Sequence, residues 1–123
     1  MNSAQIEAEI GRLEVQVIKW INKNKKLEQM KSYIPELKTQ LTTAKTRIEN
    51  SRDNILGAYL STEAQAEKYK LESMISEIAN INSQLNSINI QANRNIATNK
   101  HRIVKLNEEI SSLKMQLSGG SLV

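Results

Sequence analysis

The fold is decided by residues 71–92, which read LESMISEIANINSQLNSINIQA. Leu71, Ile78, Leu85 and Ala92 fall at steps of seven, and apolar residues between them give a spacing of three and four. This spacing is typical of an amphipathic helix that buries one narrow stripe against another helix. The stretch therefore predicts a long α-helix that needs a helical neighbour.

The same seven-residue period occurs in the first half of the chain and predicts a second long helix there. The stripe expected in the first half is Ile10, Leu13, Val17, Trp20, Asn24, Leu27, Met30, Ile34, Leu37, Leu41, Ala44 and Ile48. The stripe expected in the second half is Leu71, Met74, Ile78, Ile81, Leu85, Ile88, Ala92, Ile96, Asn99, Ile103, Leu106, Ile110, Leu113 and Leu117. Each stripe has one irregular step, at Asn24–Met30 and at Ile88–Ile96, where we expect a local change of supercoil.

Turn-forming residues place the boundaries of the two helices. We expect the first helix at about 3–50, with Ser3 as N-cap, and a bend at about 51–61 that contains Gly57. The second helix is expected at about 62–117, because Thr62 and Gln65 have capping-box spacing, although a start nearer Ala58 is an alternative. Residues 118–123 then form a flexible tail. Pro35 lies inside the first helix and predicts either a kink in a continuous helix, which we favour, or a break.

Composition agrees with an all-α fold in one domain, residues 1–117. Aromatic residues make up only 3% of the chain, there is no Phe and only one Pro, so a thick core and a sheet are both disfavoured. A short connection between two long amphipathic helices usually gives an antiparallel hairpin. We therefore predict an elongated, coiled-coil-like antiparallel hairpin. Because two helices shield their stripes poorly, we also expect a second molecule or a partner helix.

The sequence offers no candidate catalytic, metal-binding or cofactor-binding residues. There is no Cys, and the single histidine, His101, has basic neighbours at Lys100, Arg102 and Lys105. The carboxylates are scattered at spacings that suit surface ion pairs, and no phosphate-binding loop or nucleophile motif is present. We therefore expect a protein that is not an enzyme and uses no cofactor.

Charge and hydropathy bear on partners and location. The net charge of +4 is modest, and its densest basic segment surrounds Trp20, with Lys19, Lys23, Lys25, Lys26 and Lys31. Such lysines usually form a solvated helix face; an acidic partner is the alternative, and nucleic acid or an anionic membrane is a weaker one. No stretch approaches the roughly 20 apolar residues of a membrane span, and the start of the chain lacks a secretory signal. We expect synthesis in the cytoplasm, with export alongside a partner left open.

An uncharged stretch, residues 78–93, is the best candidate for a contact surface. It carries five Asn among Ser and Gln, and such a face approaches another helix without desolvating ions. A neutral exposed face is the alternative. The predicted partner-binding residues are Ile78, Ile81, Leu85, Ile88, Ala92 and Ile96, with Trp20 and Leu27 from the first helix. Asn99 lies on the stripe, where a buried Asn fixes register at some cost in stability.

The bend carries a family resemblance. It reads Ile55-Leu56-Gly57 followed by Ala58-Tyr59. A helical hairpin with this bend resembles the Trp-x-Gly superfamily of type VII secretion in Gram-positive bacteria, with Gly57 matching and Ile55 in place of the Trp. Among its members the chain is most similar to the small helical proteins that accompany LXG polymorphic toxins, which share a lysine-rich first helix, a Gly-x-Tyr bend and a second helix like Ile78–Ile110.

The resemblance implies a targeting chaperone or adaptor. In that family the small protein binds the helical N-terminal domain of the toxin, and the bundle is presented to the secretion machinery. The alternative is a self-assembling structural coiled coil in which identical chains bury the stripes. These readings differ in whether the stable species contains a second protein.

Overall fold

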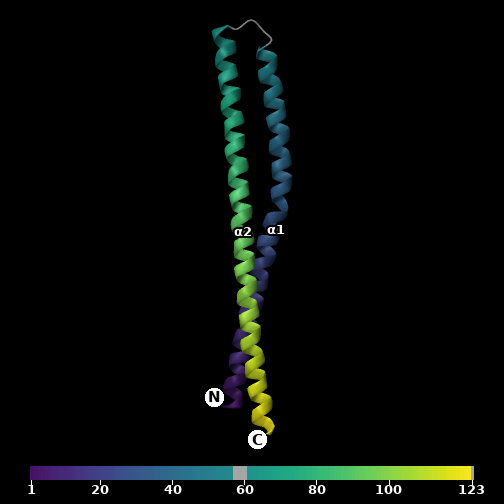
Figure 1. Cartoon of the computed structure of the whole chain (residues 1–123), viewed down its shortest axis with the longest axis vertical. Helices are drawn as coiled ribbons and strands as arrows, with labels where there is room; N and C mark the ends of the chain where they lie inside the picture. The colour runs from purple at the N-terminus through teal and green to yellow at the C-terminus, as the bar shows by residue number, and fades with distance from the viewer. Residues whose placement is uncertain (57–60, 123) are drawn as a thin grey trace. The chain divides into compact units, whose positions relative to one another are not determined.

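The computed structural model describes residues 1–56 and 61–122, with side chains described for 1–55 and 61–119. Two helices account for this part of the chain, α1 at Ser3–Leu56 and α2 at Thr62–Leu122 (Figure 1). No strand occurs among the described residues, which confirms the all-α prediction. The centre of the predicted bend, with Gly57 and Tyr59, lies outside the described residues.

Polar side chains one residue before each helix explain where the helices begin. The Asn2 side chain accepts from the Gln5 amide at 2.8 Å, while the Gln5 side chain accepts from the Asn2 amide at 2.9 Å. This is a reciprocal capping box, so Asn2 caps α1 and the expected cap Ser3 is wrong. The Ser61 hydroxyl accepts from the Ala64 amide at 3.1 Å. The start of α2 at Thr62 is therefore confirmed, with Ser61 as its cap.

Both helices end later than expected. α1 continues through residues 51–56 instead of turning at about 50, and α2 continues through 118–122 where we expected a tail. Turn-forming residues lower helix propensity by at most about 1 kcal/mol each, and a helix that already exists gains a hydrogen bond with every added residue. α1 also passes through Pro35 without a break, so of the two alternatives the continuous helix is confirmed.

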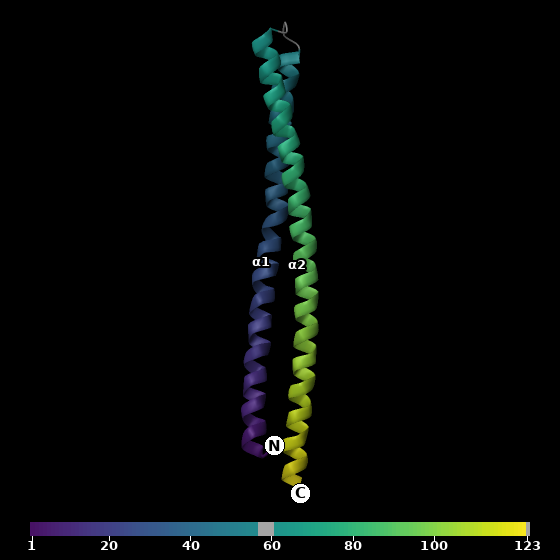
Figure 2. The ribbon, with the colours of Figure 1, turned by 90° about the vertical axis from the view of Figure 1, so that its left-hand side faces the viewer.

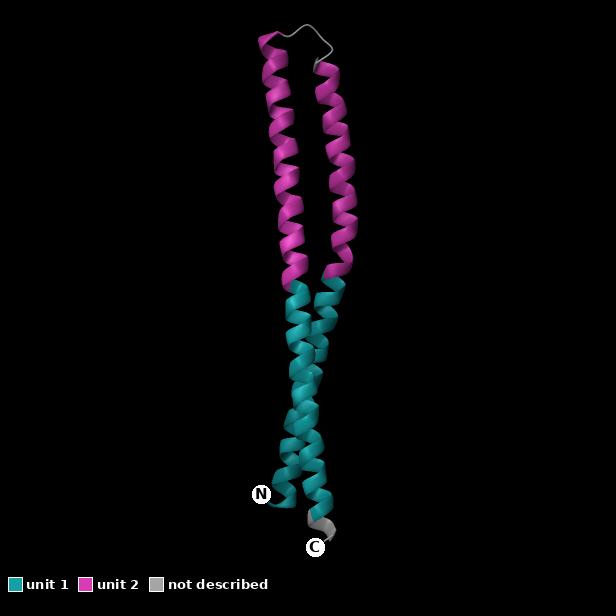
Figure 3. Cartoon of the chain, in the orientation of Figure 1, with its two compact units in different colours: residues 1–30, 92–123 teal, residues 31–91 magenta. Residues whose placement is uncertain are grey.

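The described contacts divide the chain into two compact units, each built from a segment of both helices (Figure 3). Unit 1 comprises residues 1–30 and 92–123, and unit 2 comprises residues 31–91. We had expected one domain. Within each unit the two segments lie side by side and run antiparallel, as two perpendicular views show (Figures 1 and 2).

Apolar residues are buried between the two helix segments of each unit. In unit 1 the buried cluster is Ile6, Ile10, Leu13 and Ile110, with Val17, Leu106, Leu113 and Leu117 packed against it. In unit 2 Ile34 and Ile78 are buried. The predicted helix-to-helix packing of the stripes is thus present in both units.

The line of covered positions, which we call the seam, differs from the predicted stripes at several steps. In α2 it runs Leu71, Ile75, Ile78, Asn82, Leu85, Asn89, Ala92, Ile96 and Asn99. Met74, Ile81 and Ile88, which we had placed in the stripe, are instead 48%, 41% and 44% exposed. The seam alternates strictly between steps of four and three, so the irregular step predicted at Ile88–Ile96 is absent.

The same correction applies to α1, where lysines replace apolar residues in the seam. Lys31 and Lys38 are partly covered, whereas the predicted Met30 and Leu37 are 39% and 43% exposed. A seam between two helices must repeat every 3.5 residues to stay facing its partner. Strict alternation therefore outweighs the apolar character of the neighbouring residue, because a long Lys side chain covers the seam with its methylenes while its ammonium reaches water.

Candidate protein-binding surface

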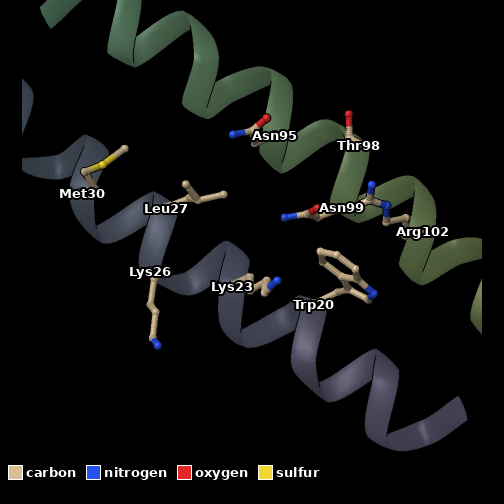
Figure 4. A pocket seen from close by; sticks show the side chains of 9 residues that line it. All are labelled: Trp20, Lys23, Lys26, Leu27, Met30, Asn95, Thr98, Asn99 and Arg102. Carbon is tan, nitrogen blue, oxygen red and sulfur yellow. Dashed lines mark hydrogen bonds between the residues drawn. The ribbon is translucent and has the colours of Figure 1, made fainter.

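The only tryptophan of the chain, Trp20, lines a groove in unit 1. We call it the Trp20 groove; its lining residues are Trp20, Lys23, Lys26, Leu27, Met30, Asn95, Thr98, Asn99 and Arg102 (Figure 4). Its volume is about 540 Å³. Trp20 and Leu27 lie in the seam of α1 and are half-buried, so one edge of each side chain packs between the helices while the other lines the groove.

Cations surround the Trp20 ring. The Arg102 guanidinium lies 4.3 Å from the ring centroid, and the Lys23 and Lys19 ammonium groups lie at 4.5 and 5.4 Å. Figure 4 shows that Lys23 on α1 and Arg102 on α2 both lie near the indole. A cation over an indole face within about 6 Å is attracted by the ring's quadrupole. The ring therefore helps to hold the cations of two helices at one place.

A buried amide pair lies beside the groove. The Asn99 Nδ2 donates to Asn24 Oδ1 at 2.9 Å, and the Asn24 Nδ2 donates to the Ile96 carbonyl at 3.3 Å. Arg102 donates to Asn99 Oδ1 at 3.3 Å, which links the pair to the groove. Asn24 and Asn99 are 9% and 6% exposed, and no buried side-chain polar atom in the described part of the chain lacks a partner. This pair is suited to fix the register of the two segments, the role predicted for Asn99.

The groove also shows which side chains share one side of the hairpin. Lys23 and Met30 of α1 and Asn95 and Arg102 of α2 each come one residue before a seam position, and all four line it. A two-fold axis perpendicular to two antiparallel helices exchanges one helix for the other. Residues that come one position before the seam on either helix therefore lie on the same side of the pair, and residues one position after the seam lie on the opposite side. A groove on the opposite side of unit 1 contains Ile21, Glu28 and Lys100, each one residue after a seam position.

The same geometry in unit 2 gives an apolar side. Met74, Ile81 and Ile88, spaced by seven on α2, each precede a seam position, and we call them the isoleucine row. Leu37 precedes Lys38 on α1, so it shares the side of the row. All four are between 41% and 48% exposed. Residues 78–93 carry no charge, so the row beyond Glu77 lacks the Lys and Glu that normally flank a helix seam.

Lysine and asparagine also meet across unit 2. Lys38 on α1 donates to Asn86 Oδ1 on α2, an exposed contact. Asn86 follows the seam residue Leu85, so this contact lies on the side opposite the isoleucine row. Part of the uncharged stretch is thus used within the hairpin, while Ile81 and Ile88 of the row are exposed.

The predicted partner-binding residues separate into three groups. Ile78, Ala92 and Ile96 are buried between the helices of their own unit, and Leu85 is half-buried there. Ile81 and Ile88 are exposed in the row. Trp20 and Leu27 line the groove. The inward members are therefore unavailable to a partner while the hairpin is closed, because α1 and α2 cover them.

Some residues that the sequence did not single out contribute to the site. Arg102 is 82 positions from Trp20 in the sequence and reaches it only through the antiparallel pairing. Asn24 was assigned to the stripe without a partner; the signal that would have found its role is the matching Asn99 on the other stripe. Of the bend residues, Ile55 is half-buried in the last turn of α1.

One ion pair shifts the acidity of its members. Arg12 donates to Glu9 at 3.0 and 2.5 Å, and this hydrogen bond, assisted by the opposite charge, holds the pKa of the Glu9 carboxyl below its usual value.

No group of three or more His, Cys, Asp or Glu in the described residues is arranged to hold a metal ion. Within the same residues, neither helix has a long enough apolar stretch to cross a membrane.

Comparison with protein-family models, with curated proteins and with solved structures finds no match for this chain.

Proposed function

We propose that the chain is a non-enzymatic helical adaptor that binds helices of a larger protein. The observation that carries this proposal is the isoleucine row. Met74, Ile81 and Ile88 repeat every seven residues on an exposed side, next to Leu37 of the other helix. Single exposed apolar residues are common, but a row at helical period is typical of a surface that another helix covers, and here the charged neighbours Lys70 and Glu77 lie only toward its Met74 end.

The energy available from the row can be approximated from its exposure. Fully burying a Leu, Ile or Met side chain contributes about 1.5–3 kcal/mol. Nearly half of each of the four side chains is still exposed, so covering them contributes roughly 3–5 kcal/mol in all. Association costs about 4–15 kcal/mol in lost freedom, so the row needs further contacts to give a stable complex.

The charge distribution favours a different protein over a second copy. Residues 1–30 and 92–123 contain ten Lys and Arg against six Asp and Glu, whereas residues 31–91 contain seven of each. The whole net charge of +4 therefore belongs to unit 1. A symmetric dimer about the Trp20 groove would bring like charges together, which opposes association. A partner with acidic helices avoids that repulsion.

The class of partner follows from the resemblance at Ile55-Leu56-Gly57. On that basis the proposed partner is the helical N-terminal domain of a secreted LXG-type toxin, and the adaptor acts as a targeting chaperone for type VII secretion. A self-assembling structural coiled coil is the alternative, since an uncharged row suits an identical chain as well. The two proposals differ in the composition of the purified species.

The test is recovery of the complex from the native host with matched variants. Tagged wild-type protein is purified at moderate salt, and the eluate is examined by mass spectrometry and light scattering. Ile81→Asp and Ile88→Asp should each remove the partner, because each inserts a charge into the covered row. Ile90→Asp is the control, since Ile90 is 51% exposed outside the row and carries the same change.

Circular dichroism distinguishes lost binding from lost folding. The proposal requires that both row variants keep wild-type helix content and lose a partner that the Ile90→Asp protein retains. Retention of the partner by the row variants contradicts the assignment of this surface. A homo-oligomer that dissociates only in the row variants, with no second protein, supports the structural coiled coil instead.

A further inference from the structure

We infer that the Trp20 groove binds a carboxylate-bearing segment, namely an acidic amphipathic helix of a partner protein. The inference rests on the proposed function, because it assigns the chemistry of a second contact made by the same adaptor. The groove supplies what such a helix needs, an apolar floor and a cluster of cations at the Trp20 ring. It also supplies contacts beyond those of the isoleucine row.

The cations of the groove have no acidic partner within the described residues. The lining cations Lys23, Lys26 and Arg102 are exposed, as is Lys19 beside the Trp20 ring, and the ion pairs seen in the described chain join other residues. Arg102 makes one neutral hydrogen bond, to Asn99. The four charges come from two helices whose residues are far apart in sequence. An arriving carboxylate would therefore find cations that need not first leave another acid.

The indole arranges these charges. With Arg102 at 4.3 Å and Lys23 at 4.5 Å from the Trp20 centroid, both cations are drawn to the ring. The ordering of long side chains is a large part of the cost of a surface ion pair. Cations already held against an indole lose less freedom when a carboxylate binds, so the ring pre-organises the site.

The floor of the groove favours a protein segment over nucleic acid. Leu27 and Met30 line it together with one face of Trp20, while Asn95 and Thr98 line its α2 side without charge. A nucleic-acid surface usually follows the phosphate backbone with basic residues along its length. Here the cations gather at the Trp20 end of one apolar floor, which matches a helix with Leu or Ile on one face and Glu or Asp on its border.

The chain carries its own probe for this site. Trp20 is the only tryptophan, so fluorescence excited at wavelengths that tyrosine does not absorb reports on the groove. The ligands are two synthetic helices about three heptads long with Leu at the core positions, one with Glu and one with Lys at the flanking positions. Binding of the Glu peptide to the full chain should shift Trp20 emission to the blue, and the affinity should fall as salt is raised.

Charge reversal tests the assigned residues. The variant Lys23→Glu with Arg102→Glu should weaken binding of the Glu peptide by roughly tenfold, since two attractions between opposite charges become repulsions. The control, Arg47→Glu with Lys70→Glu, changes net charge equally, but both substitutions lie in unit 2. It should change the affinity by less than about twofold. Circular dichroism confirms equal helix content in the two proteins.

Three outcomes overturn the inference. One is equal affinity for the Glu and Lys peptides, and a second is an equal loss in the control variant, which would indicate attraction to net charge only. The third is tighter binding of single-stranded DNA than of the Glu peptide. The result is separable from the test of the isoleucine row, because the peptide experiment needs only the groove and leaves Ile81 and Ile88 unchanged.

Discussion

The buried amides Asn24 and Asn99 give a prediction that can be calculated before it is measured. Each is replaced by Leu, which has nearly the same branched shape, alone and together. In Asn99→Leu, the Asn24 Oδ1 loses the donor Asn99 Nδ2, while Asn24 Nδ2 keeps the Ile96 carbonyl. In Asn24→Leu, the Asn99 Nδ2 loses its acceptor, while its Oδ1 keeps Arg102. Each single variant thus leaves one buried amide atom unpaired.

The expected signal is the coupling free energy between the two positions. The coupling free energy is the change in stability of the double variant minus the sum of the changes in the two single variants. The burial of each Leu contributes equally to its single variant and to the double variant, so it cancels from this difference. What remains is the cost of the unpaired amide atom in each single variant, at least about 1 kcal/mol per atom. We therefore expect a coupling of about 2 kcal/mol, with the double variant more stable than the sum of the single changes.

The assay is urea unfolding followed by circular dichroism for the wild type, both single variants and the double variant. Each protein is measured at two concentrations, because self-association would shift the transition. A second cycle, Lys38→Met with Asn86→Leu, is the control. That hydrogen bond is exposed, so water replaces either partner and the coupling should stay below about 0.5 kcal/mol.

A coupling below about 0.5 kcal/mol at Asn24 and Asn99 would refute the reasoning, because it would mean that water satisfies these amides once either partner is gone. The pair also bears on specificity. Removing the polar residues of a seam relaxes its register and oligomeric state. We therefore expect sedimentation of the double-Leu variant to show oligomers that the wild type does not form.

Two further predictions concern local features of α1. Gly11→Ala should raise the free energy of unfolding by about 1 kcal/mol, because Gly11 is exposed inside the helix and an added Cβ meets no atom within 4 Å. The control Ala8→Gly, at another exposed position, should lower the free energy of unfolding by a similar amount. A lower free energy of unfolding in Gly11→Ala would contradict this prediction. Arg12→Gln should raise the pKa of the Glu9 carboxyl, followed by NMR titration, because the hydrogen bond to Arg12 lowers that pKa. The pKa of Glu9 is lower in the folded chain than in the unfolded chain. The stabilisation of the fold by the Glu9–Arg12 pair is therefore fully present above the unfolded pKa and is lost as the pH falls through the folded pKa. An unchanged Glu9 pKa in Arg12→Gln would contradict this prediction.

Regular patterns made much of the fold predictable. The seven-residue period identified both helices, and its members Leu71, Ile78, Leu85 and Ala92 all lie in the observed seam. The start of α2 followed from the polar residues beside Thr62, although Ser61 is the one that caps it. Helix ends were less predictable, because continuing an existing helix costs so little that turn-forming residues do not stop it.

The candidate surface was only half visible in the sequence. From one seam residue, a step of three and a step of four lead to two adjacent residues. Where one of these two is apolar, the sequence analysis assigned it to the stripe, as with Ile81 in place of Asn82. Antiparallel packing selects the residue that keeps the 3.5-residue repeat, so Asn82 lies in the seam and Ile81 faces outward. An apolar residue that appeared to be core is for this reason a surface residue.

The sequence by itself determined that the chain forms two long amphipathic helices, because hydrophobic period, capping residues and the lack of sheet-forming clusters act locally along the chain. Only the tertiary structure decided which side chains remain exposed and which distant ones meet. The pairing of Asn24 with Asn99, and of Trp20 with Arg102, depends on the register of two antiparallel segments. Register is set by the sum of contacts across the whole seam, and no single motif encodes that sum.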